Sequence, residues 1–241
     1  MKRLLDLSVS LLGLLIFSPL LLVVMFLVWN QDKKSPFYIA SRVGKNKKNF
    51  NMVKLRSMIK NADKTGVDST GLDDNRITPI GSFIRKYKLD ELTQLWNVLI
   101  GNMSLVGPRP NVKNDTNLYT EVEKELLSVR PGITDFSSIV FSDEGEILNN
   151  KADPDISYNQ LIRPWKSRLG LIYIKNQTFI LDIKLIFFTL IAIFSKDFAL
   201  KWLSNYLVYL GVDERVVLIS QRQLDLYPFP PPGSEEIITS R

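Results

Sequence analysis

The chain has 241 residues, of which 45% are hydrophobic and 23% are charged, so it can fold around a sizeable core and is not a disordered polymer. It contains no cysteine and no histidine, which excludes disulfides, thiolate nucleophiles, imidazole general bases and most transition-metal sites. The net charge is +6 and residues 33–60 hold nine Lys or Arg and no acid, which favours a phosphorylated substrate or an anionic membrane over nucleic acid, because no nucleic-acid-binding motif accompanies the charge.

Residues 7–29 are mostly apolar and exceed the roughly 20 residues that a bilayer-spanning helix needs. Ser18 and Pro19 lie in the middle, and proline kinks or breaks a helix. Each half would extend on the order of 17 Å, which is too short to cross a hydrocarbon core of about 30 Å. Both flanks are basic: Lys2 and Arg3 before the segment, Lys33 and Lys34 after it. Because positively charged flanks stay in the cytoplasm, we expect either a kinked span or a re-entrant helix that turns at Ser18-Pro19.

Two short strands are predicted at residues 36–43 and 49–58, joined by the basic turn GKNKKN. Strand side chains alternate, so Lys54 and Arg56 would share one face of the second strand. This arrangement could bind phosphate, although two exposed bases on an edge strand are the simpler interpretation. The polar, Asp- and Gly-rich residues 61–75 are expected to form a loop.

The run DELTQLWNVLIG, residues 90–101, has the apolar spacing of an amphipathic helix, given by Leu92, Leu95, Trp96 and Leu99. Asp90 is expected to cap its N-terminus, and Gly101 to end it. The following MSLVGPRP predicts a short buried strand that ends in a rigid turn. A capping box at residues 120–123 predicts a further helix that ends at residues 130–132.

Residues 178–194 and 198–211 are predicted to form amphipathic helices in the membrane interface, with burial in the protein core as the alternative. The proline-rich end, residues 227–241, is expected to be extended and poorly ordered.

Asp90 and Glu91 are adjacent acids at a helix start, where the simplest explanation is that they complement the helix dipole. Basic residues on both sides in the sequence suggest a further role. Arg109 lies between two prolines that restrict its backbone, and a guanidinium held in this way suits forked hydrogen bonds to phosphate oxygens. Carboxylates among cations indicate phosphoryl chemistry, in which a carboxylate can also serve as the nucleophile.

Three segments together resemble the bacterial sugar transferases, the monotopic polyprenyl-phosphate phosphoglycosyl transferases that start glycan assembly. They are VKLRSM at 53–58, RITPIGSFIRKYKLDELTQLWNVLIGNMSLVGPRP at 76–110 and RPGIT at 130–134. The resemblance covers roughly residues 1–190. It implies a mainly helical α+β fold with a re-entrant membrane helix at 1–31, a transferase domain at 32–195 that carries a small β-hairpin and a catalytic helix, and a C-terminal interfacial helix and tail at 196–241.

The resemblance also implies a reaction. Asp90 would attack the sugar-linked phosphate of a UDP-sugar, UMP would leave, and polyprenyl phosphate would take the phosphosugar from Asp90. Glu91 would help to hold Mg²⁺. Phosphate contacts would come from five cations: Lys54, Arg56, Arg109 and, as weaker candidates, Arg85 and Arg130.

The implied setting is the cytoplasmic face of the bacterial inner membrane, with the bilayer, possible downstream glycosyltransferases and a possible second copy of the chain as partners. Three positions differ from the family pattern and concern the sugar and nucleotide contacts: Ala40 for glutamine, Asp135 for glycine and Gly170 for aspartate. The competing hypothesis is a non-catalytic scaffold on the membrane surface for glycan-assembly proteins.

Overall fold

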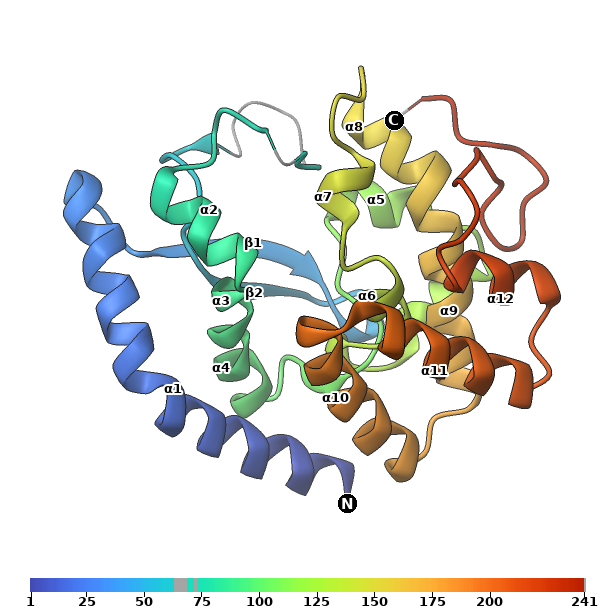
Figure 1. Ribbon diagram of the computed structural model, residues 1–241, viewed down its shortest axis with the longest axis horizontal. Helices are drawn as coiled ribbons and strands as arrows, with labels where there is room; N and C mark the ends of the chain where they lie inside the picture. Colours follow the sequence, from blue (N-terminus) through green and yellow to red (C-terminus); the bar gives the residue numbers. More distant parts are fainter. Residues whose placement is uncertain (63–68, 72, 241) are drawn as a thin grey trace.

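The computed structural model describes residues 1–62, 69–71 and 73–240, so part of the loop expected at 61–75 lies outside the described residues. The chain is mainly helical, with an antiparallel β1–β2 pair and a parallel β3–β4 pair (Figure 1). This confirms the expected fold class in its coarse form. The elements are α1 (Lys2–Asp32), β1 (Phe37–Val43), η1 (Lys45–Lys47), β2 (Asn49–Leu55), α2 (Pro79–Lys86), α3 (Leu89–Leu92), α4 (Gln94–Leu99), β3 (Ser104–Val106), α5 (Lys113–Asn117), η3 (Glu123–Ser128), β4 (Gly132–Thr134), α6 (Phe136–Val140), α7 (Glu144–Ile147), α8 (Pro154–Ser157), η4 (Tyr158–Ile162), α9 (Arg163–Lys175), α10 (Phe179–Phe194), α11 (Lys196–Tyr209) and α12 (Glu214–Ser220).

Helix α1 runs along the outside of the fold and changes direction about midway (Figure 1). Residues 2–32 form one helix, so the separate halves expected on either side of Ser18-Pro19 are joined. Pro19 lies inside the helix, and the Ser18 hydroxyl donates to the Leu15 carbonyl at 2.8 Å. Among the described helices, α1 is long and apolar enough to cross a membrane by length and composition.

The N-terminal end of α1 is bonded to the folded body of the protein. Lys2 Nζ donates to Asp182 Oδ2 at 2.7 Å and to the Val106 carbonyl at 2.9 Å. Arg3 donates to the last carbonyls of α4, those of Val98 and Leu99. A basic N-terminus therefore pairs with the negative end of one helix and with a buried acid of another.

The C-terminal end of α1 is bonded to the same body. Asp32 accepts two hydrogen bonds from Arg56, at 2.6 and 2.7 Å. Val28, which is fully buried, packs in a cluster with Leu55 and Ile84. Because both ends of α1 contact one compact unit, the helix wraps around that unit, and its apolar outer side stays exposed.

The β1–β2 hairpin forms as predicted, with Tyr38 opposite Lys54 in its register. Helix α4 fastens the hairpin through Asn97, which is fully buried: its side chain accepts from the Val53 amide at 2.8 Å and donates to the Asn51 carbonyl at 2.7 Å. Trp96, expected on the buried face of this helix, is instead 50% exposed. The polar Asn97 thus faces the protein, and part of the apolar stripe faces outward.

The predicted strand after α4 is present as β3, which is buried along its length. It pairs in parallel with β4, a short strand within the RPGIT segment that the sequence analysis did not predict. The start of β4 lies close to the backbone that follows β3: a Cβ on Gly132, the first residue of β4, would lie 2.1 Å from the Gly107 nitrogen. Glycine is required at this crossing because a side chain would clash with the opposite main chain.

Helices α6, α9, α10 and α11 enclose the main core, whose central side chains include Phe136, Trp165 and Leu185. Helix α10 divides its apolar residues between two sides. Phe188 packs inward and stacks on Trp202 of α11, with ring centroids 3.7 Å apart. The outward residues of α10 remain exposed, among them Ile180, Ile183, Phe187, Leu190 and Ile193. The core interpretation is therefore confirmed for the inward side of this segment, and location in the membrane interface stays a prediction for its exposed side.

The proline-rich tail is extended, and its described part, residues 227–240, bonds to the folded body where the sequence predicted a poorly ordered end. Phe229 stacks on Trp165 with ring centroids 4.5 Å apart, and the Pro230 carbonyl accepts from Arg168 at 3.0 Å. Further along, the Ile238 carbonyl accepts from Gln160 at 2.7 Å. The tail packs because its aromatic and carbonyl groups meet the solvent side of η4 and α9.

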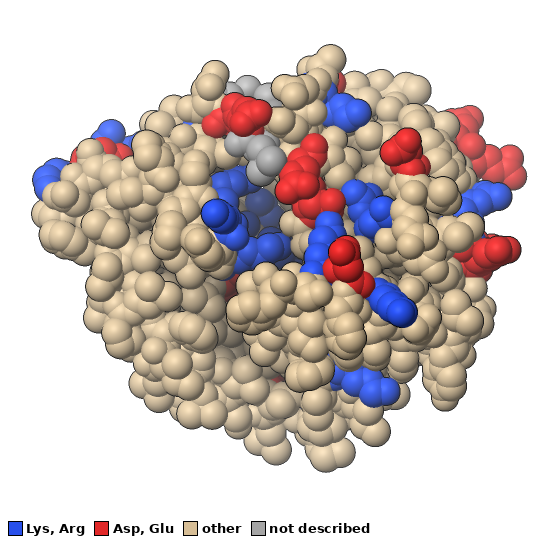
Figure 2. Space-filling model, viewed as in Figure 1, with Lys and Arg blue, Asp and Glu red and all other residues tan. Residues whose placement is uncertain are grey.

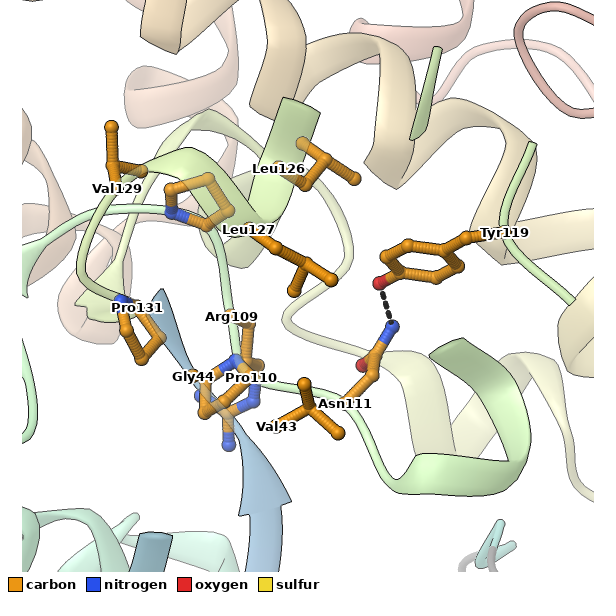
Figure 3. A pocket seen from close by; sticks show the side chains of 11 residues that line it. Val43, Gly44, Arg109, Pro110, Asn111, Tyr119, Leu126, Leu127, Val129 and Pro131 are labelled. Atoms are coloured by element: carbon orange, nitrogen blue, oxygen red, sulfur yellow. Dashed lines mark hydrogen bonds between the residues drawn. The ribbon is translucent and has the colours of Figure 1, made fainter. Parts of the chain in front are cut away.

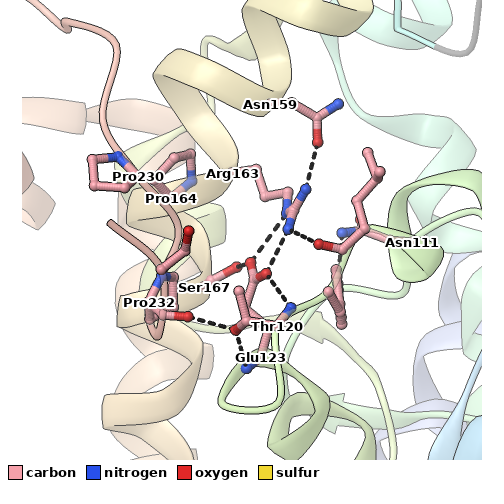
Figure 4. A network of polar contacts seen from close by, with 12 residues as sticks. Asn111, Thr120, Glu123, Asn159, Arg163, Pro164, Ser167, Pro230 and Pro232 are labelled. Atoms are coloured by element: carbon pink, nitrogen blue, oxygen red, sulfur yellow. Dashed lines mark hydrogen bonds and ion pairs between the residues drawn. The ribbon is translucent and has the colours of Figure 1, made fainter. Parts of the chain in front are cut away.

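A buried ion pair lies beneath this tail (Figure 4). The predicted capping box forms, with reciprocal bonds between Thr120 and Glu123, although the segment it starts is the 3₁₀ turn η3 and not an α-helix. Glu123 also accepts from Arg163 and Ser167. The Pro232 carbonyl accepts from the Thr120 hydroxyl, which joins the tail to the network.

Candidate active site

Asp90 and Glu91 lie in the first turn of α3, directly beside the hairpin. Lys88 takes a left-handed conformation, φ 52°, and occupies the capping position, so the prediction that Asp90 caps this helix is wrong. Asp90 is the second residue of the helix, after Leu89. Thr93 fixes this turn, because its hydroxyl bonds the Asp90 carbonyl at 3.0 Å and the Val53 carbonyl of β2 at 3.1 Å.

Each of the two acids faces a cation from another element. Lys54 Nζ on β2 lies 3.7 Å from Asp90 Oδ2. Arg109 Nη2, in the turn after β3, lies 2.9 Å from Glu91 Oε1. The hairpin, the Asp90–Glu91 turn of α3 and the GPRP turn therefore meet at one place. The four side chains are between 17 and 29% exposed, so they are reachable from solvent and yet partly shielded from it.

The site lies in a hollow in which basic side chains collect (Figure 2). Burial lowers the pKa of Lys54, and the neighbouring Asp90 opposes that shift. Burial raises the pKa of Glu91, but the cations Arg109, Lys88 and Lys54 outweigh it, so the net shift is downward. The Arg109 guanidinium has a raised pKa because Glu91 stabilises its charge. Such a hollow is suited to an anionic ligand, because partial desolvation strengthens each attraction.

Two further charged groups join the site that the sequence did not reveal. Glu144, the first residue of α7, forms an ion pair with Lys166 of α9. Burial raises the pKa of Glu144, but Lys166, Arg109 and Lys54 together lower it below its ordinary value. Glu144 is 35 residues from Arg109 in the chain, and no local motif marks it.

The turn that carries Arg109 is held by contacts from several elements. Gly170 of α9 lies against it, since a Cβ at that position would meet Leu126 at 2.8 Å and Pro108 at 3.6 Å. A glycine thus lets α9 approach the turn where the family commonly carries aspartate. Arg109 lines two small neighbouring pockets. In the first, Asn111 donates to the Tyr119 hydroxyl at 2.9 Å (Figure 3).

The other two departures from the family pattern also have structural roles. Asp135 caps α6, accepting from the Ser138 amide at 2.8 Å and from the Ser137 hydroxyl at 2.7 Å. Its burial raises its pKa. Ala40 is buried on β1 against the main core.

Three of the predicted phosphate-binding residues lie apart from these ion pairs. Arg56 follows β2, and its guanidinium donates hydrogen bonds to Asp32 and to the Ser35 and Val28 carbonyls. It therefore joins the hairpin to α1. Arg85 is in the last turn of α2, and its charge acts on Asp74. Arg130 is exposed beside the Gly107–Gly132 crossing, where its carbonyl faces Gly107.

The residues of the site were compared with what Mg²⁺ requires of a protein. The described residues contain no group of three or more acidic side chains placed for a metal ion. Mg²⁺ usually takes one or two carboxylates and completes its octahedron with substrate phosphates and water. Glu91 supplies one such carboxylate, so the residues present fit an ion whose other ligands come from a phosphorylated substrate and water.

Comparison with known proteins agrees with this arrangement. The sequence profile of the family described as bacterial sugar transferase matches residues 1–196. The exopolysaccharide production protein ExoY of Sinorhizobium fredii is 32% identical over 207 residues, which cover 80% of this chain and 84% of that protein. The undecaprenyl-phosphate glucose phosphotransferase of Komagataeibacter xylinus is 37% identical over 78% of this chain. An uncharacterized sugar transferase of Haemophilus influenzae is 34% identical over 82% of this chain.

The relatives differ in length. The matched region spans 84% of the rhizobial protein, but 41% of the Haemophilus protein and 35% of the Komagataeibacter protein. The family profile covers the region that holds the Asp90–Glu91 turn and the GPRP turn with Arg109. The profile match covers more than two thirds of the chain, and the chain therefore belongs to the bacterial sugar transferase family.

Proposed function

We propose that the protein transfers a sugar 1-phosphate from a UDP-sugar to polyprenyl phosphate, with release of UMP. The observation that carries the proposal is the pair of facing contacts, Lys54 with Asp90 and Arg109 with Glu91, in a basic hollow. Relatives named as undecaprenyl-phosphate glucose phosphotransferase, of Komagataeibacter xylinus, and undecaprenyl-phosphate galactose phosphotransferase, of Salmonella typhimurium, support the phosphosugar-transfer part of the proposal.

Asp90 acts as the nucleophile in this scheme. Its carboxylate attacks the sugar-linked phosphorus of the donor, an acyl-phosphate bond forms, and the bond to the bridging oxygen breaks so that UMP leaves with that electron pair. A phosphate oxygen of the polyprenyl phosphate then attacks the same phosphorus and releases the Asp90 carboxylate. Placement of Asp90 inside the helix turn, with its backbone held by Thr93, limits the positions from which it can attack.

The cations neutralise the charge that makes two anions repel. Lys54 shields Asp90, and Arg109 offers a planar fork to phosphate oxygens. Lys166 and Glu144 extend the charged lining, and Glu144 keeps Lys166 in place. When Mg²⁺ is bound with the substrate, Glu91 would help to hold it and the ion would neutralise diphosphate charge.

The membrane geometry follows from the two anchored ends of α1. Lys2 and Arg3 at one end, and Asp32 at the other, are bonded to the same folded unit. A helix that crossed the bilayer fully would carry one of these ends to the opposite side, away from its partners. We therefore infer that α1 enters and leaves the same face, bending at Pro19, while its exposed apolar residues and those of α10 contact lipid. Tags placed before Leu4 and after Lys34 should report the same side.

This placement brings the site close to a lipid phosphate. The acceptor's hydrocarbon chain can stay in the bilayer while its phosphate reaches Asp90. In bacteria the proposal locates the protein at the cytoplasmic face of the inner membrane, where the product would pass to downstream glycosyltransferases.

A product assay tests the reaction. Purified protein in lipid is incubated with polyprenyl phosphate and each of a panel of UDP-sugars, and the released nucleotide is identified. We expect UMP from wild type, loss of turnover in Asp90→Asn, and normal turnover in Asp225→Asn, which makes the same substitution at an exposed tail position. UDP as the product would contradict phosphosugar transfer, and membrane binding with no nucleotide product from any donor would support the scaffold hypothesis.

A further inference from the structure

Residues 197–241 lie beyond the part of the chain that matches the family profile, yet one of them contacts the segment next to the active site. That segment is the α6–α7 corner, residues 141–144, which ends in Glu144. Arg222, just after α12, donates through Nη2 to Asp143 Oδ2 at 3.1 Å. Its guanidinium also lies over the Phe141 ring, 5.5 Å from the centroid.

A second cation binds the same carboxylate. Lys196 Nζ lies 2.8 Å from Asp143 Oδ2. Asp143 is thus held between α11 and the end of α12, and its side chain is 17% exposed. These cations lower the pKa of Asp143 against the effect of its burial, so the carboxylate is charged and attracts both partners at neutral pH.

Holding Asp143 also holds the helix that follows. Its carbonyl accepts from the Glu146 amide at 2.9 Å and the Ile147 amide at 3.2 Å, which makes Asp143 the start of α7. Glu144 is the next residue and is ion-paired with Lys166. The position of Glu144 therefore depends on a four-residue corner that is held through Asp143 by Lys196, at the end of the family region, and by Arg222, outside it.

This contact is poorly arranged for stability alone. Asp143 Oδ1 and Arg222 Nε are both buried and lack a hydrogen-bond partner in the described residues. A buried unsatisfied polar atom costs free energy. The pair is single and not forked, so it fixes where the corner lies without using the full bonding capacity of either group.

We propose that Arg222 is a positioning residue for the active site, which acts through Asp143 to hold Glu144 against Lys166. The inference rests on the proposed phosphosugar transfer, in which the Glu144–Lys166 pair lines the phosphate site. Without Arg222, the corner can shift and Lys166 loses its fixed partner, although every group that touches substrate is still present.

Steady-state kinetics of phosphosugar transfer tests the proposal. Arg222→Ala should lower kcat on the order of tenfold, as expected of a small displacement of catalytic groups, and Arg222→Lys should recover most of the loss. Arg215→Ala is the matched control, because Arg215 is on α12, seven residues before Arg222, and lies over the ring of Phe229. It should keep wild-type kcat. An Arg222→Ala variant as active as Arg215→Ala would overturn the proposal.

A double-mutant comparison separates positioning from general destabilisation. In a Glu144→Gln background, Arg222→Ala should change kcat by less than about twofold, because the group it positions is already altered. Full additivity of the two losses would overturn the proposal.

Hydrogen–deuterium exchange gives a readout that needs no activity. Amides of residues 141–148 should exchange faster in Arg222→Ala than in Arg215→Ala, and equal exchange would overturn the proposal. If wild type released no UMP, the proposed function would fail, while the exchange measurement would still decide whether Arg222 holds the corner.

Discussion

Replacing Glu123 with alanine removes the carboxylate on which the buried network of Figure 4 converges. Arg163 Nε and Nη2 bond it at 3.0 and 2.5 Å, the Ser167 hydroxyl at 2.6 Å and the Thr120 amide at 3.1 Å. The Arg163 and Glu123 side chains are 1% and 0% exposed. The substitution therefore leaves a guanidinium buried without its counter-ion and a hydroxyl and an amide without an acceptor.

Removing one partner of a buried ion pair costs about 3–5 kcal/mol. Arg163 keeps its bonds to Asn159 and to the Leu118 carbonyl, which favours the lower part of that range. For a chain of this size, each kcal/mol corresponds to roughly 2–4 °C, so Tm should fall by about 6–20 °C.

Thermal unfolding of the lipid- or detergent-bound protein, followed by circular dichroism, measures this shift. Glu121→Ala provides the matched control, because Glu121 is 88% exposed and pairs with Lys124 on the surface. Its loss should change stability by no more than about 0.5 kcal/mol. If Glu123→Ala melted within 2 °C or so of Glu121→Ala, the energetic importance assigned to burial in this network would be refuted.

Three other substitutions probe the site and its support. Gly132→Ala should cost about 3 kcal/mol or more by denaturant unfolding, because its Cβ would meet the Gly107 nitrogen at 2.1 Å; a cost below 1 kcal/mol or so would contradict the crossing. Asn97→Ala leaves two backbone groups of β2 unpaired and should lower the free energy of unfolding by about 1–3 kcal/mol for each. It should also lower kcat, because Lys54 is on that strand. An unchanged kcat would show that the position of the hairpin does not affect catalysis. Glu144 has a folded-state pKa below its ordinary value of 4.5, so it stabilises the fold at pH 7 and loses that contribution as pH falls below 4.5. The stability difference between wild type and Glu144→Gln should therefore shrink on acidification, and a difference that grows would reverse the assigned sign.

Local patterns in the sequence predicted the elements whose structure is determined locally. Alternation marked the hairpin, and Gly101 ends α4 with φ 91° as expected of a helix stop. The capping box at Thr120 and Glu123 formed because its bonds span three residues. The sequence placed the N-cap at Asp90, two residues after the observed cap, because Lys88 adopts a left-handed conformation that its residue type does not signal.

These local patterns could not predict contacts between residues that are far apart in the sequence. Alternation placed Lys54 and Arg56 on one strand face, but Arg56 lies just beyond the strand and is taken by Asp32 from α1. The Glu144–Lys166 pair depends on how α7 packs against α9, which no spacing in the sequence encodes. Parallel pairing of β3 with β4 likewise joins segments more than 20 residues apart.

The central claim is that Asp90 becomes bonded to phosphorus during turnover. Intact-protein mass spectrometry after incubation with a UDP-sugar, in the absence of polyprenyl phosphate, tests it most directly. The account predicts a mass increase equal to one phosphosugar, located at Asp90 by peptide mapping and absent from Asp90→Asn. An unmodified protein, under conditions where added polyprenyl phosphate still yields product, would contradict it.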